Sequence, residues 1–176
     1  PYKSELYSIA GNQRLLQGTT QGYDIVSRSN GVKTFNQYSS LIEDFNKLSG
    51  VASDSVFADT YSKLLRSSLA KTESIGALLD DVTLNPTFAR DSVSQQFEQV
   101  SKLIKMRDQL QTERAVFVVS RGGFDTHNTW EMQNQFGDIN AGVAGFHAEM
   151  VAQGIWDDVT VVTVSDFGRT LTSNGQ

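Results

Sequence analysis

The sequence predicts an α/β fold with a parallel β-sheet at its core and several amphipathic helices around it. Two apolar runs, at residues 115–119 and 159–164, are rich in β-branched side chains and are bounded by turn-forming residues, which is typical of buried parallel strands. Between them, residues from about 130 to 153 repeat apolar side chains on one helix face. A strand, a helix and a second strand in this order form the unit that allows parallel pairing through a right-handed crossover.

The first half of the chain adds short strands and three helices. Apolar patches at residues 6–11 and 23–26 predict short strands or extended loops. Apolar residues three and four apart then predict a helix at residues 35–48. A second helix begins near Ser53 or Asp54, which are good N-cap residues.

This second helix is expected to break or bend near Gly76, where the apolar spacing slips. A third helix is predicted from about residue 91 to 110, with Asp91 or Ser92 as its cap.

Composition limits the classes of partner. The chain has 176 residues, of which 39% are hydrophobic, and this is enough for one globular core. A formal net charge of -5 and the absence of a dense basic run argue against binding to nucleic acid. No apolar run approaches the roughly 20 residues of a membrane helix. Because the chain has no cysteine, disulfides and thiolate metal sites are excluded.

Polar loops follow both strands of the predicted strand, helix, strand unit. The first loop, SRGGFDTH, covers residues 120–127, and the second, SDFGRT, covers residues 165–170. Ligands of open α/β sheets bind beyond the carboxyl ends of the strands. We therefore expect the two loops to face one crevice and to carry the function.

The first loop offers a carboxylate and an imidazole. Gly122 and Gly123 permit the backbone conformations and close approach that a site loop requires. Asp125 and His127 are two residues apart, so in an extended chain both side chains leave the same side. This pair suits Zn or another divalent cation. The alternative is that Asp125 accepts hydrogen bonds from loop amides and His127 caps the following helix.

The second loop offers an acid and an anion binder. Asp166 follows the strand, and Arg169 carries a planar guanidinium suited to a phosphate, sulfate or carboxylate. The alternative is a buried pair of Asp166 with Arg169 that holds the loop together. Taken together, the two loops fit a metal-assisted site for an oxyanion ester better than a dinucleotide site, because no GxGxxG motif follows a strand.

Other polar residues have simpler interpretations. We expect His147 to be a helix-surface or packing residue. Asp157 and Asp158 are expected to cap a turn, and Ser120 and Thr126 have hydroxyls but no evident adjacent base.

The motifs GGFDTH and VTVVTVSDFGRTLTSNG resemble those of the bacterial family called domain of unknown function 1501, whose members carry GGWDTH or GGFDTH followed by SEFGRT and NG. The similarity extends back through QFEQVSKLIKMRDQL at residues 96–110 and YSIAGNQRLLQG at residues 7–18, so it covers most of the chain. That family is placed in the alkaline phosphatase and sulfatase superfamily.

This resemblance implies an α/β/α sandwich of the alkaline phosphatase-like type. It assigns Asp125, His127 and Asp166 as ligands of a divalent metal ion such as Zn, Mg, Ca or Mn, and Arg169 as the residue that holds the substrate oxyanion. The activity implied is hydrolysis of a phosphate or sulfate ester of a small molecule or glycan by an exported protein. The alternative is a non-catalytic structural or binding protein that retains the fold.

The chain departs from the family pattern in two respects. Asp166 stands where most relatives have Glu, which shortens the ligand arm by one methylene. The family also begins with a strand and an acid-containing GG loop and continues after NG with a GTDH segment, and residues 1–176 contain neither. We therefore expect these residues to form a single partial domain, with the nucleophile outside this segment.

Overall fold

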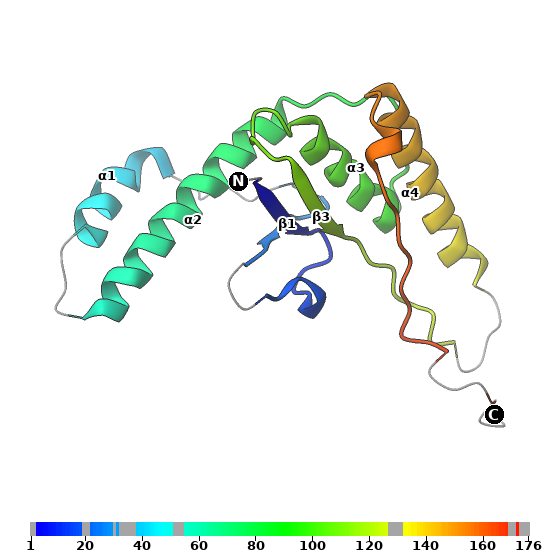
Figure 1. Cartoon of the computed structure of the whole chain (residues 1–176), viewed down its shortest axis with the longest axis horizontal. Coiled ribbons are helices and arrows are strands. Elements are labelled where there is room, and N and C mark those ends of the chain that lie inside the picture. Colours follow the sequence, from blue (N-terminus) through cyan, green and yellow to red (C-terminus); the bar gives the residue numbers. More distant parts are fainter. Residues whose placement is uncertain are drawn as a thin grey trace.

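A computed structural model describes residues 3–18, 22–29, 31, 38–50, 55–126, 132–168 and 172 of the chain. Within these residues it contains a small parallel β-sheet and four α-helices (Figure 1). The strands are β1 (Ser4–Ser8), β2 (Asp24–Ile25) and β3 (Arg114–Val118), in the order β2-β1-β3. The predicted α/β class and parallel sheet are confirmed.

All three strands end at the same edge of the sheet because both pairings are parallel. Tyr7 of β1 lies opposite Phe117 of β3, and their rings stack with centroids 5.4 Å apart. The backbone N–H of Ile9 then donates to the carbonyl of Val118 at 3.0 Å. We call this end of the sheet the carboxyl edge.

The four helices are α1 (Tyr38–Ser49), α2 (Val56–Asp80), α3 (Ser92–Lys105) and α4 (Gln133–Ala152). Each predicted helix is present, but α3 ends at Lys105 and not near residue 110 as predicted. In Figure 1, α3 and α4 lie against each other beside the sheet, while α1 and the first half of α2 extend away from it. Of the described helices, none combines the length and apolar character needed to cross a membrane.

Helix ends follow capping chemistry. The N-cap of α2 is Ser55 rather than Ser53 or Asp54, which lie outside the described residues, and its side chain accepts from the backbone N–H of Ala58. The predicted Asp91 cap of α3 is confirmed, because its carboxylate accepts from two backbone N–H groups at 2.8 and 2.9 Å.

The predicted bend near Gly76 is wrong, because α2 is continuous from Val56 to Asp80. Ile75, Gly76 and Leu79 are buried in this part of the helix. Tertiary packing there outweighs the cost of roughly 1 kcal/mol that a glycine brings to a helix interior.

The predicted second strand at residues 159–164 is also wrong. After a short 3-10 helix at Trp156–Asp158, this segment pairs with no strand of the described residues. Val162 and Val164 are 74% and 76% exposed. The apolar pattern indicated a buried strand, but burial requires a partner strand and a covering layer, which periodicity does not specify.

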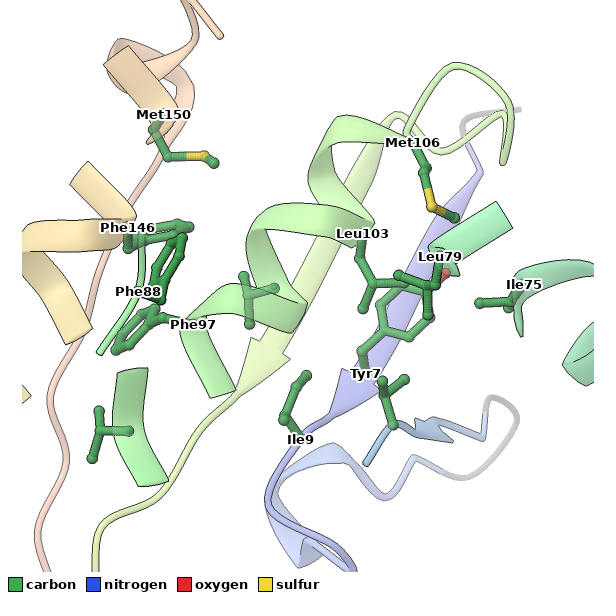
Figure 2. Close-up of a cluster of buried hydrophobic side chains, with 13 residues drawn as sticks. Tyr7, Ile9, Ile75, Leu79, Phe88, Phe97, Leu103, Met106, Phe146 and Met150 are labelled. Carbon is green, nitrogen blue, oxygen red and sulfur yellow. The ribbon is translucent and has the colours of Figure 1, made fainter. Parts of the chain in front are cut away.

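The hydrophobic core lies between the sheet, α2, α3 and α4 (Figure 2). Its buried members include Tyr7, Ile9, Ile75, Leu79, Phe88, Phe97, Leu103, Met106, Phe146 and Met150. A tight contact between two helices lies at Gly142 of α4, where a Cβ would come within 2.9 Å of side-chain atoms of Phe97 and Val93 in α3. The packing of α4 against α3 therefore leaves no room for a side chain at this position.

Gly142→Ala should lower the free energy of unfolding by about 1 to 3 kcal/mol, because the added methyl overpacks the contact between α3 and α4. Chemical denaturation measures this. Gly137→Ala is the matched control on the same helix, because a Cβ there meets nothing within 4 Å. The control should gain up to about 1 kcal/mol from helix propensity. Equal effects of the two substitutions would show that the helices have room to separate.

Ion pairs connect α2 to β1 and β2. Lys71 of α2 lies 2.9 Å from Glu5 of β1 and 2.6 Å from Asp24 of β2, and Lys3 lies 3.3 Å from Glu5. Desolvation by burial acts to raise the pKa of Glu5, but the hydrogen bonds and positive charges of Lys71 and Lys3 outweigh it and lower that pKa.

A lowered pKa means that Glu5 stabilises the fold above its ordinary pKa and that this stabilisation is lost as pH falls through the lowered value. The loss of unfolding free energy between about pH 7 and about pH 3 should therefore be smaller in Glu5→Gln than in the wild type. Glu43→Gln, on an exposed part of α1, should keep the wild-type profile. Identical acid profiles for Glu5→Gln and the wild type would contradict the role given to Glu5.

Candidate functional site

The loop at residues 120–126 begins at a point fixed by a buried side chain. Gln96 of α3 is only 3% exposed, and its amide makes two bonds to the backbone of Ser120. The Ser120 N–H donates to Gln96 Oε1 at 2.8 Å, and Gln96 Nε2 donates to the Ser120 carbonyl at 2.8 Å. The loop therefore leaves the carboxyl edge attached to α3.

The next residues are bound to the first turns of α4. Arg121 Nε lies 2.8 Å from the Asp138 carboxylate, and Arg121 also donates to the Gly122 carbonyl at 2.7 Å. Gln135 Nε2 donates to the Gly123 carbonyl at 2.7 Å. Two side chains of α4 thus hold consecutive parts of the loop.

The end of the loop is set by a glycine and an aromatic pair. Gly123 has φ +84, in the left-handed region that favours glycine. Phe124 then packs edge-on against Phe136 of α4, with ring centroids 5.6 Å apart. Asp125 follows directly and is exposed. The fold places this carboxylate at the end of an anchored loop beyond a parallel strand.

Of the other three predicted site residues, only Asp166 lies among the described residues. His127 and Arg169 lie outside the described residues. Asp166 is exposed and follows the extended segment at residues 159–165. In Figures 1 and 2 this segment and the chain that follows β3 run along the molecule in the same direction.

The shared site of Asp125, His127, Asp166 and Arg169 therefore stays a prediction. The described residues contain no group of three or more His, Asp or Glu side chains arranged to hold a metal ion. The interpretation of His147 is confirmed: it is exposed on α4, and its ring packs edge-on against Trp156 with centroids 4.5 Å apart.

Two residues at the carboxyl edge escaped the sequence analysis. Gln96 was placed in a predicted helix and in a segment that resembles the family, but was given no role at the site, although it falls between Val93 and Val100 on the buried side of α3. A glutamine on an apolar face was the available signal. Arg28 follows β2, and its guanidinium donates to Ser92 Oγ at 2.5 Å, so it brings a cation to the same edge.

Removing the Arg121 partner should loosen the loop without unfolding the protein. In Asp138→Ala, chymotrypsin should cut after Phe124 faster than in the wild type, because the loop opens more often. The thermal midpoint should change little, since both side chains of this ion pair still reach solvent, with 27% and 25% exposed, and such a pair is worth about 1 kcal/mol. Asp44→Ala, which removes an exposed ion pair in α1, is the control. Equal cleavage rates in both variants would mean that the Asp138 contact does not hold the loop.

Comparison with known proteins identifies one family. A family model described as a protein of unknown function (DUF1501) matches residues 19–176. No curated protein and no solved structure matches the chain.

Proposed function

Because this chain belongs to the DUF1501 family of proteins of unknown function, we propose its activity from the site itself: metal-dependent hydrolysis of a phosphate or sulfate ester, in a domain of the alkaline phosphatase-like type. The observation that carries this proposal is the anchored loop at residues 120–126, which presents Asp125 beyond the carboxyl end of a parallel strand.

The donor chemistry of the two loops fits a divalent cation. Asp125 and Asp166 are exposed carboxylates, and His127 follows Asp125 by two residues. Carboxylate oxygens together with an imidazole nitrogen are ligands of Zn²⁺ and related ions. Once bound, the metal would polarise the ester and neutralise charge on the transferring group.

The residues of this chain supply binding and orientation. Asp125, His127 and Asp166 are the proposed ligands, and Arg169 is the proposed partner of the substrate oxyanion through its planar fork of N–H donors.

Anchoring of the loop supports a catalytic role over a simple connection between strand and helix. A ligand must be held close to its productive position by hydrogen bonds and packing around it. Three side chains outside the loop each bind a different residue of it. Gln96 binds the backbone of Ser120, Asp138 binds the Arg121 side chain, and Gln135 binds the Gly123 carbonyl. A loop of seven residues that carries the candidate ligand Asp125 is therefore bound at three separate points.

The ligand assignment is tested by metal titration of the purified protein. Zn²⁺ should bind, and Asp125→Ala or His127→Ala should weaken binding by at least about 100-fold. Removing a residue that only supports a metal ligand typically lowers metal affinity about 10- to 100-fold, and removing the ligand itself should cost more. Asp157→Ala, which removes another exposed acid, is the control. Metal affinity unchanged in both ligand variants would falsify the assignment.

Hydrolysis is tested with aryl phosphate and aryl sulfate esters, with and without a chelator. Turnover should require the metal, and Arg169→Ala should lower kcat/KM while Zn²⁺ affinity stays constant. Metal binding without turnover of either ester would contradict the hydrolase proposal. That outcome would support the alternative, a non-catalytic structural or binding protein.

A further inference from the structure

We propose that Gln96 is a positioning residue, whose buried amide sets where the loop at residues 120–126 leaves the sheet and thereby where Asp125 can meet a metal ion. The metal part of this inference rests on the proposed function. Gln96 touches no ligand itself and acts through the backbone of Ser120.

The Gln96 amide takes the place of a neighbouring strand just beyond the end of β3. The last backbone bond between β1 and β3 joins Ile9 to Val118. Two residues later, the N–H and carbonyl of Ser120 are both bonded by one side chain, as they would be by a neighbouring strand. A side-chain amide can make this pair because it carries a donor and an acceptor side by side.

The amide is itself held in one orientation. Gln96 Nε2 also donates to the Ser92 carbonyl at 3.0 Å, one turn back on α3. The Ser92 hydroxyl in turn accepts from Arg28, which follows β2. A continuous chain of hydrogen bonds therefore links the loops that follow β2 and β3 through the first turn of α3.

A purely structural role does not require a polar group at this position. Gln96 lies on the buried side of α3 beside Phe97, where an apolar side chain of similar size would fill the same space without a desolvation cost. Ser120 is exposed, so water can satisfy its backbone if the amide is lost. Losing Gln96 should therefore release the loop and leave the fold intact.

The test compares Gln96→Met with Gln99→Met. Gln99 is the matched control, because it lies on the same helix and is 6% exposed, but it donates to the Arg28 carbonyl and not to the loop. The first readout is hydrogen exchange of the Ser120 amide. Exchange should accelerate by about 10-fold or more in Gln96→Met, as expected when a bond of about 1.4 kcal/mol or more is lost. It should stay at the wild-type rate in Gln99→Met.

The second readout is Zn²⁺ affinity measured by titration. Gln96→Met should raise the Kd about 10- to 100-fold, the usual effect of removing a residue that orients a ligand. Gln99→Met should leave it unchanged even if both variants lose similar thermal stability. If Gln96 only held the loop, exchange of the Ser120 amide would still be faster in Gln96→Met, but the two variants would have the same Zn²⁺ affinity.

Gln96→Glu keeps the proposal testable if Gln96→Met fails to fold. An ionised glutamate still accepts from the Ser120 N–H but cannot donate to the Ser120 carbonyl, so exchange of the Ser120 amide should fall between wild type and Gln96→Met. Wild-type exchange in Gln96→Met, or faster exchange with unchanged Zn²⁺ affinity, would overturn the proposal. Failure of the wild type to bind Zn²⁺ would instead remove the proposed function, and exchange alone would then decide whether Gln96 holds the loop.

Discussion

Parallel pairing of β1 with β3 determines how the other described elements are arranged. It joins residues 4–8 to residues 114–118, so the chain between them, which includes α1, α2 and α3, must return to the same small sheet. Closing so long a loop costs entropy, and stacking of Tyr7 on Phe117 with burial of the surrounding core offsets that cost. Because the pairing is parallel, the loops that follow β1, β2 and β3 share one edge.

Helices α3 and α4 hold the loop that follows β3 at this edge. The Gly142 contact brings α4 close to α3, and the two helices then supply the groups that bind the loop after β3. Gln96 holds the start of the loop, and Arg121 with Asp138 holds its middle. Contacts made by residues other than the proposed metal ligands thus set the path of the loop that carries Asp125.

The parts of the fold that the sequence predicted correctly are those that depend on local patterns. The helices, the Asp91 cap and β3 follow from periodicity and capping within the chain segment itself. The predicted pairing between the two apolar runs was wrong because parallel partners are chosen by the whole fold, and β3 pairs with β1. Gln96 was missed for the same reason, since its partner Ser120 is distant in sequence.

Only part of the candidate site could be predicted from local sequence. The glycines and acid of the first loop stand where expected, at the end of a strand. The convergence of Asp125 with Asp166 depends on the path of residues 159–168, which the apolar pattern described incorrectly. Periodicity specifies which face of a segment is apolar, whereas the meeting of two loops requires tertiary geometry.

The proposed metal site can be tested by the X-ray absorption spectrum of the Zn²⁺-loaded protein. We predict oxygen and nitrogen ligands at about 2.0 to 2.2 Å that include one imidazole, which His127→Ala removes and His147→Ala retains. A bound Zn²⁺ ion whose spectrum shows no imidazole, or an imidazole lost only in His147→Ala, would rule out His127 as a ligand.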